Sequence, residues 1–279
     1  MTGSSVSSVA SNQPLKLPTK FLEKVWGSED LLPFFPTSEK KIGEVWFEAE
    51  LPLLVKFVFT TGRLSVQVHP DDSYARAHEN SLGKTEMWYI LRADPGARIA
   101  LGLREKVTRE RLREAATTGE IEGLLNWLDV EAGNAFFVPA GTIHAIGEGL
   151  AILEIQQHSD VTYRLYDYGR PRELHLDKAL DVAITEPTNA KSVMLPIDCP
   201  YFHTELARVT APIRYVPAAD RFHLLIFVSG QGVIGTEPFQ EGQAWLVPAG
   251  SAPFQIAPVG YDPLGADAVK FLRTWIPAP

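Results

Sequence analysis

Short apolar runs separated by turn residues recur along most of the chain. GEVWFEA (43–49), LLVKFVFT (53–60), AFFVPAG (135–141) and HLLIFVSG (223–230) are rich in β-branched and aromatic residues, which favour strands. Twenty-one glycines and twenty-one prolines lie mostly between such runs, as expected where tight turns connect strands. The pattern therefore predicts a mainly β protein.

Apolar residues recur near helical spacing in one long segment, Thr108 to Leu128, first at Leu112, Ala115 and Ala116 and later at Ile121, Leu124, Leu125 and Leu128. This spacing predicts a helical insertion near residues 105–130. A second, short helix is expected over Leu176 to Ala183.

An approximate internal repeat divides the chain. GNAFFVPAGTIHAI begins at residue 133 and GQAWLVPAGSAPFQI at residue 242, and both read Gly-x5-Pro-x-Gly, a strand that ends in a turn and re-enters as another strand. Three residues after the second glycine the first copy has His144 and the second has Pro253. We therefore expect two barrel-like β units, of which only the first has a polar site.

The domain boundaries predicted from this division are a disordered, Ser-rich tail over residues 1–17, an N-terminal domain over 18–185 and a C-terminal domain over 186–279. The tail has neither the basic start nor the apolar stretch of a signal peptide.

Polar residues alternate with valines in the segment SVQVHPDD, which starts at Ser65. Residues two apart in a strand share a face, so Ser65, Gln67 and His69 point one way. Lys84 and Glu86 share a face in the same manner after the next turn. If these strands meet inside a barrel, Gln67, His69 and Glu86 converge.

His144 can complete this group, because it follows a Pro-x-Gly turn that could direct it into the barrel mouth. Two simpler explanations remain open: His69 could be a hydrogen-bonded histidine at a strand end, and Lys84 could form a salt bridge with Glu86. A buried glutamate is costly unless it is paired or binds a cation. Glutamine, two histidines and a glutamate suit Zn²⁺ and, less selectively, Fe²⁺, Mn²⁺ or Co²⁺.

Composition and charge exclude several classes of protein and of metal site. The only cysteine, Cys199, rules out a disulfide framework and a Cys-rich zinc site, which fits a reducing, cytoplasmic location. A net charge of -8 at pH 7 leaves no broad basic surface for nucleic acid. No apolar run is long enough to span a bilayer, so we expect no membrane association.

The other histidines are expected to be exposed or structural, because they lie in polar or turn-like surroundings: His78, His158, His175 and His203. His223 stands at about the place of Glu86 in the second unit, but the other candidate ligands are missing there. No second metal site is predicted.

The pattern Gly-x5-Pro-x-Gly-x2-His resembles the second motif of the cupins, which are small β-barrel metal proteins. SVQVHPDD, GKTEMWYIL, VPAGTIHAIGEG and LEIQQHSDVTYRLYDYGR, within Phe21 to Arg170, together resemble the type I mannose-6-phosphate isomerase family in its short bacterial form. The resemblance implies two cupin-like jelly-roll barrels, the second degenerate. It also implies one Zn²⁺ per chain, held by Gln67, His69, Glu86 and His144.

The implied reaction is the interconversion of mannose 6-phosphate and fructose 6-phosphate through an enediolate. Such a reaction needs a base, an electrophile and a phosphate clamp. Lys84 or Glu154 could be the base, and this choice stays open. Arg164 is expected among the catalytic groups and, with Arg170, in the clamp, since a guanidinium donates two hydrogen bonds to phosphate at once.

Ser65 and Lys84 are expected to contact the sugar phosphate as well. Alternatively, Arg164 could simply pair with Asp160 or Asp167 at the surface. Two other functions remain open: an iron-dependent cupin oxygenase and a non-catalytic sugar-phosphate-binding cupin. We expect a monomer or a homodimer.

Overall fold

The computed structural model describes residues 13–259 and 268–278. The chain forms two compact units, one of Pro18–Ile197 and one of Met1–Leu17 with Asp198–Pro279. Residues 1–12 of the expected tail lie outside the described residues, whereas Leu15–Lys16 form strand β1, which pairs with β19. The N-terminal unit thus extends to Ile197, beyond the expected boundary after residue 185.

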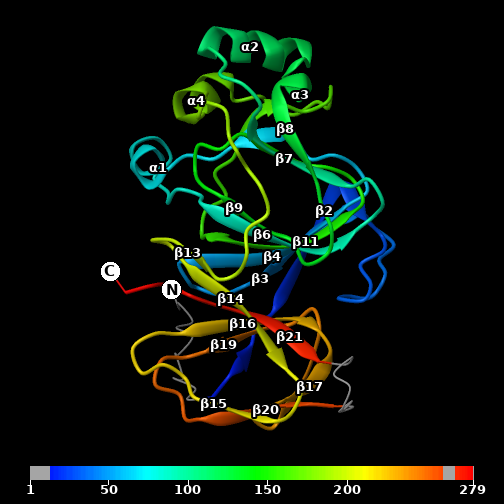
Figure 1. Ribbon diagram of the computed structural model, residues 1–279, viewed down its shortest axis with the longest axis vertical. Coiled ribbons are helices and arrows are strands. Elements are labelled where there is room, and N and C mark those ends of the chain that lie inside the picture. Colours follow the sequence, from blue (N-terminus) through cyan, green and yellow to red (C-terminus); the bar gives the residue numbers. More distant parts are fainter. Residues whose placement is uncertain (1–12, 260–267, 279) are drawn as a thin grey trace, which may run out of the picture. The chain divides into compact units, whose positions relative to one another are not determined.

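Two antiparallel sheets build the N-terminal unit (Figure 1), which confirms the mainly β prediction. The first has the order β2-β3-β4-β11-β6-β9, with bounds β2 Thr19–Ser28, β3 Ile42–Phe47, β4 Leu53–Thr60, β6 Glu86–Ala93, β9 Ala135–Val138 and β11 Leu150–Gln157. The second has the order β12-β5-β10-β7-β8, with bounds β5 Val66–Val68, β7 Arg98–Leu103, β8 Leu125–Asp129, β10 His144–Ile146 and β12 Tyr163–Tyr166.

The core of this unit has two parts. Val58, Ile90, Leu101 and Ile152 belong to a buried apolar cluster contributed by both sheets. A second cluster joins the β5–β12 sheet to the helical layer, through residues such as Leu112. Because β4 and β11 lie in the middle of their sheet, every one of their residues is buried. Any charged side chain on these two strands must therefore find its partner inside the protein.

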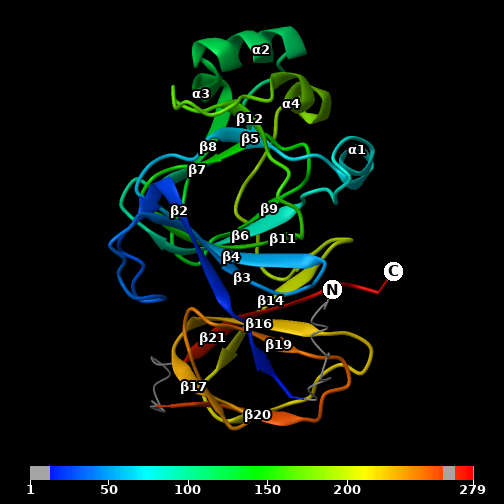
Figure 2. The same cartoon turned by 180° about the vertical axis from the view of Figure 1, so that it is seen from behind.

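The helices of the unit are α1 Asp72–His78, α2 Arg109–Thr118, α3 Ile121–Leu124 and α4 Leu176–Val182. Figures 1 and 2 both show α2, α3 and α4 gathered at the β7–β8 end of the unit. The helix expected over Leu176 to Ala183 is confirmed as α4. No helix in the part of the chain that the structure describes is both long and apolar enough to cross a membrane.

The prediction of a single helix over Thr108 to Leu128 is wrong for the second half of this segment. Thr108 caps α2 by accepting a hydrogen bond from the Arg111 amide (3.2 Å). Gly119 then ends α2 in the left-handed conformation (φ 85°), as glycines after helices commonly do. After the short α3, Leu125 and Leu128 lie in strand β8 and pair with β7.

Helix α1 was missed altogether, because the Pro-Asp-Asp sequence at residues 70–72 was interpreted as a turn. Asp71 instead caps α1, and its carboxylate accepts a hydrogen bond from the Tyr74 amide (2.8 Å). Asp is a favoured residue at this position.

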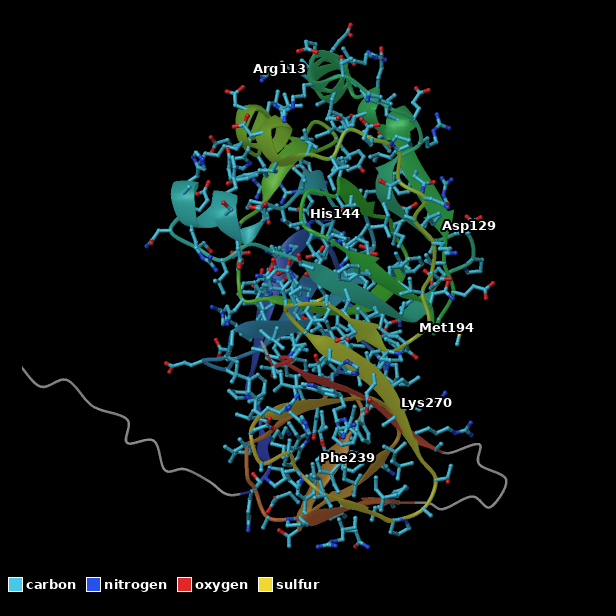
Figure 3. The ribbon with its side chains drawn as sticks, turned by 60° about the vertical axis from the view of Figure 1, so that its left-hand side comes forward. Arg113, Asp129, His144, Met194, Phe239 and Lys270 are labelled. Carbon is cyan, nitrogen blue, oxygen red and sulfur yellow. The ribbon has the colours of Figure 1, made fainter. Side chains whose placement is uncertain are left out.

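Two further sheets make up the C-terminal unit. One has the order β1-β19-β16-β21-β14-β13, with bounds β13 Ile197–Asp198, β14 His203–Val209, β16 His223–Ser229, β19 Ala244–Val247 and β21 Val269–Trp275. The other has the order β15-β20-β17-β18, with bounds β15 Ile213–Tyr215, β17 Gln231–Ile234, β18 Glu237–Gln240 and β20 Phe254–Pro258. Phe239, labelled in Figure 3, stacks on Phe227 in the core, with ring centroids 3.8 Å apart.

The sequence repeat is a repeat of structure. In the first copy β9 pairs with β6 and puts Val138 opposite Glu86. In the second copy β19 pairs with β16 and puts Val247 opposite His223. Glu86 and His223 therefore occupy matching positions in their units, as the sequence suggested.

Candidate functional site

Three of the four predicted metal ligands meet inside the N-terminal unit, at the ends of strands from both sheets. His69 follows β5, Glu86 begins β6 and His144 begins β10, and each residue is only 1% exposed. Glu86 Oε1 lies 3.4 Å from His144 Nε2, and Glu86 Oε2 lies 3.7 Å from His69 Nε2. Figure 3 shows His144 among the strands of this unit.

Backbone carbonyls orient both imidazoles. His69 Nδ1 lies 2.9 Å from the Val161 carbonyl oxygen, and His144 Nδ1 lies 2.9 Å from that of Thr142. A carbonyl only accepts, so each Nδ1 carries the proton and each Nε2 presents its lone pair. Burial and the Lys84 charge hold the pKa of His69 well below its usual value, and burial lowers the pKa of His144 to about 4.

The donor geometry fits a divalent metal ion. With bonds of about 2.1 Å, neighbouring ligand atoms of a tetrahedral zinc site lie about 3.4 Å apart. The two distances from Glu86, 3.4 and 3.7 Å, match this spacing. His144 Nε2 is buried and has no hydrogen-bond partner among the described residues, as expected of an atom that binds a metal. His69, Glu86 and His144 thus form a potential metal-binding triad.

Gln67, the fourth predicted ligand, lies directly opposite His144 in the pairing of β5 with β10. Residues directly opposite each other in an antiparallel pair project from the same face. Gln67 also lines a cavity of about 270 Å³. Its position is therefore compatible with the fourth ligand that the sequence suggested.

Lys84 forms the ion pair that was the simpler explanation for the buried glutamate. Its Nζ lies 2.8 Å from Glu86 Oε2 and 2.9 Å from His69 Nε2. The ion pair and the triad therefore occur in the same structure. Lys84 links the candidate ligands to the cavity, which it also lines.

The cavity gathers most of the other predicted site residues, because Ser65, Lys84, Glu154 and Arg164 line it as well as Gln67. Its lining carries five cationic side chains (Lys24, Lys56, Lys84, Arg164 and Arg172) and three acidic ones (Glu44, Glu154 and Asp160), a net charge of +2. The whole chain carries -8. A cationic cavity in an acidic protein favours an anionic ligand.

Buried ion pairs line the cavity wall on β4 and β11. Lys56 Nζ lies 3.1 Å from Glu154 Oε1, and Lys84 Nζ lies 3.6 Å from the same oxygen. Burial and the nearby Glu86 charge raise the pKa of Glu154. Burial disfavours the charge of Lys56, but the Glu154 and Glu44 carboxylates outweigh it and raise the lysine pKa.

Arg164 lines the cavity without a carboxylate partner: no ion pair joins it to an acidic residue of the described ranges 13–259 and 268–278. Its Nη1 donates to the Glu173 carbonyl (3.3 Å). Burial and the charge of Arg172 lower the pKa of Arg164. The expected alternative, a pair with Asp160 or Asp167, is therefore not formed.

The structure corrects the position expected for Arg170, which does not line the cavity. Its guanidinium pairs with Asp167 (2.7 Å) and donates to the Arg63 carbonyl (2.9 Å). Arg172, two residues further on, reaches the cavity instead. Sequence analysis missed this residue, although the alternation in GRPRE offers both arginines as candidates.

Two more cavity residues were missed. Lys56 is the only charge within the apolar run LLVKFVFT, and a lysine in a buried strand was a signal that could have identified it. His175, which was expected to be exposed or structural, also lines the cavity, and its Nδ1 accepts a hydrogen bond from the Arg164 amide (3.2 Å).

Comparison with known proteins identifies sequence relatives of this chain. No protein-family model matches the chain. The chain is 39% identical to the mannose-6-phosphate isomerase of Streptococcus mutans over 217 residues, 71% of this chain and 68% of that protein. It is 33% identical to the mannose-6-phosphate isomerase ManA of Bacillus subtilis over 303 aligned residues, 88% of this chain and 96% of that protein.

Solved structures agree with these sequence relatives. The crystal structure of the mannose 6-phosphate isomerase from Bacillus subtilis superimposes with a TM-score of 0.82 at 26% identity, over 94% of this chain and 99% of that one. A putative mannosephosphate isomerase from Archaeoglobus fulgidus shares the fold, with a TM-score of 0.80 at 19% identity over 95% of this chain and 98% of that one.

Proposed function

This chain belongs to the mannose-6-phosphate isomerase family, and from that membership we propose that it interconverts mannose 6-phosphate and fructose 6-phosphate through an enediolate. One observation supports this substrate most directly. A cavity with a net charge of +2, which contains a guanidinium without a carboxylate partner, adjoins the potential metal-binding triad. A sugar phosphate would bring an anion to the guanidinium and hydroxyl oxygens to the triad.

Zn²⁺, one per chain, is the metal that we propose for the triad. His69, Glu86 and His144 would hold it through Nε2, carboxylate oxygen and Nε2, and Gln67 would add its side-chain oxygen. When bound, a divalent metal supplies Lewis acidity that favours negative charge on the substrate oxygens. Fe²⁺, Mn²⁺ and Co²⁺ accept similar ligands, so the metal has to be identified by experiment.

Arg164 and Arg172 form the phosphate clamp in this proposal. Both line the cavity. Arg172 is close enough to Arg164 for its charge to contribute to lowering the pKa of Arg164. Two neighbouring guanidiniums repel each other, and a phosphate dianion between them would turn the repulsion into two charge-assisted contacts. Arg170, which was expected in the clamp, would act through its contact with Asp167 instead.

Glu154 is the base that we propose for proton transfer between C1 and C2. It lines the cavity, and its raised pKa makes its carboxylate a stronger base than an exposed glutamate. Lys84 lies against both Glu86 and Glu154, and its Nζ would donate a hydrogen bond to the negative charge that develops on the substrate. Ser65 would donate a hydrogen bond to the sugar phosphate.

A coupled assay of mannose 6-phosphate conversion tests this proposal. The protein is treated with a chelator and the metals are added back one at a time. We expect no turnover without metal and recovery with Zn²⁺. Oxygen uptake without sugar-phosphate turnover would support the oxygenase alternative, and binding of mannose 6-phosphate without conversion would support the non-catalytic one.

The base is tested separately. With metal bound, Glu154→Gln should abolish exchange of the substrate's C2 hydrogen with solvent, whereas Lys84→Gln should slow turnover but retain exchange. The opposite result would assign the base to Lys84. Light scattering would decide between the expected monomer and homodimer, and fractionation of cells would test the expected cytoplasmic location.

A further inference from the structure

A buried carboxylate, Asp167, binds two arginines, of which Arg172 lines the cavity. Asp167 follows strand β12 and is 2% exposed. Arg172 grips it with two hydrogen bonds, from Nε to Oδ2 (2.6 Å) and from Nη2 to Oδ1 (2.7 Å). Arg170 Nη2 lies 2.7 Å from Oδ1 on the same carboxylate. Because a buried carboxylate with one partner removed is strongly unfavourable, these contacts restrict all three side chains.

Arg170 makes several contacts within the protein. Its backbone amide and its Nε both donate to the Asp167 carbonyl oxygen (3.0 and 3.1 Å). Its Nη2 also donates to the Arg63 carbonyl, two residues before Ser65. Arg170 therefore joins the segment after β12 to the segment before β5 through its Nε and Nη2.

Arg172 needs a fixed partner for a physical reason. An arginine side chain has several rotatable bonds, and Arg172 is close enough to Arg164 for its charge to contribute, after burial, to lowering the pKa of Arg164. Without a constraint, repulsion would favour orientations in which the two guanidiniums separate. The bidentate contact with Asp167 fixes the plane of the Arg172 guanidinium, and Arg172 lines the cavity in that orientation.

We propose that Asp167 is a positioning residue for substrate recognition. It holds Arg172 beside Arg164 so that the two guanidiniums can bind the phosphate group of the substrate, and Arg170 supplies the second positive charge that a buried aspartate requires. The inference rests on the proposed function and deepens it, because it makes a residue that does not touch the substrate responsible for selecting a phosphorylated sugar.

A purely electrostatic role and a positioning role for Asp167 predict opposite changes in phosphate binding for Asp167→Asn. Removal of a negative charge makes the region more positive, so simple electrostatics predicts tighter binding of a phosphate dianion. Positioning predicts weaker binding, because the Arg172 guanidinium loses its bidentate partner. The sign of the change therefore distinguishes the two explanations.

Asp160→Asn is the matched control. Asp160 also lines the cavity, but no ion pair joins it to any arginine or lysine in the described ranges. Its replacement removes the same unit of charge without releasing a guanidinium. We expect the KM of this variant for mannose 6-phosphate to fall, because the cavity loses a negative charge.

The experiment compares wild type, Asp167→Asn and Asp160→Asn as metal-loaded enzymes. For Asp167→Asn we expect KM for mannose 6-phosphate and the inhibition constant of inorganic phosphate to rise together by about tenfold, the effect of one charge-assisted contact. The kcat should stay within about threefold and the metal content should not change, since Asp167 is not a ligand. A purely structural defect would lower kcat or metal content as well.

The proposal is overturned if KM and the phosphate inhibition constant stay constant or fall in Asp167→Asn, or if kcat falls while KM is unchanged. If Asp167→Asn does not fold, Asp167→Glu decides by the same criterion, because it keeps the charge and moves the carboxylate by one methylene. A wild-type enzyme that fails to convert mannose 6-phosphate would instead refute the proposed function, which separates the two outcomes.

Discussion

Replacement of Lys56 by methionine should destabilise the N-terminal unit by about 3 kcal/mol. Lys56 and Glu154 are 7% and 3% exposed, and Nζ lies 3.1 Å from Oε1. At an effective dielectric constant of about 20, two unit charges at this separation attract by about 5 kcal/mol. Loss of one partner of such a pair costs about 3–5 kcal/mol. We expect the lower end, because Glu154 keeps Lys84 at 3.6 Å.

Urea denaturation measures this effect, with the fluorescence of Trp26, Trp46, Trp88 and Trp127 as the signal from this unit. The double variant Lys56→Met/Glu154→Leu buries no charge at either position. Its loss of unfolding free energy should therefore be smaller, by about 2 kcal/mol, than the sum of the losses in the two single variants.

The matched control is Lys40→Met, in an exposed pair with Glu23 whose side chains are 66% and 59% accessible. This change should cost less than about 1 kcal/mol. If Lys56→Met cost no more than Lys40→Met, or if the two losses at Lys56 and Glu154 simply added, the assignment of a strong buried ion pair would be refuted.

His144→Ala should abolish metal binding and turnover, checked by metal analysis and the coupled assay, whereas His158→Ala should leave both unchanged; normal metal content in His144→Ala would contradict the ligand assignment. Arg164→Met should raise KM for mannose 6-phosphate by about tenfold or more, the loss of one charge-assisted contact, and an unchanged KM would remove Arg164 from the clamp. The pKa of His223 falls from 6.5 to about 4 in the folded protein, chiefly through burial and then through Arg273. The folded state therefore binds fewer protons than the unfolded state between these values, so His223 should cost the C-terminal unit stability as the pH falls from about 6.5 to 4. After allowance for solvent screening the loss should be about 1–2 kcal/mol; thermal unfolding of wild type and His223→Phe should diverge over this interval, and parallel pH curves would contradict the shift.

Alternation along a strand predicted much of the site from sequence. Gln67 lies in strand β5 and Ser65 and His69 directly flank it, so the alternation predicted one face, and His144 lies opposite Gln67 in the pairing of β5 with β10. The family resemblance added the roles of these residues. The mainly β fold and the isomerase family are confirmed, whereas the individual roles stay predictions.

Other features depend on contacts that sequence spacing does not contain. Apolar spacing alone could not show that Leu125 leaves the helix for strand β8, since a short apolar run suits either element and pairing with β7 decides. Arg170 and Arg172 have the same chemistry and lie two residues apart. Both contact the Asp167 carboxylate, yet only Arg172 lines the cavity, and sequence spacing does not contain this difference.

The matching positions of Glu86 and His223 have a consequence for how the protein responds to metal starvation. Glu86 already pairs with Lys84 (2.8 Å) and would gain a metal ion as a further partner, whereas the imidazole of His223 is satisfied by the hydroxyl of Tyr215, 2.5 Å from Nδ1. Because a ligand that binds only the folded state stabilises it, scarcity of metal should remove stability from the N-terminal unit and spare the C-terminal one. A cell short of metal would then hold molecules that are damaged in one half only, which proteases could recognise by that half.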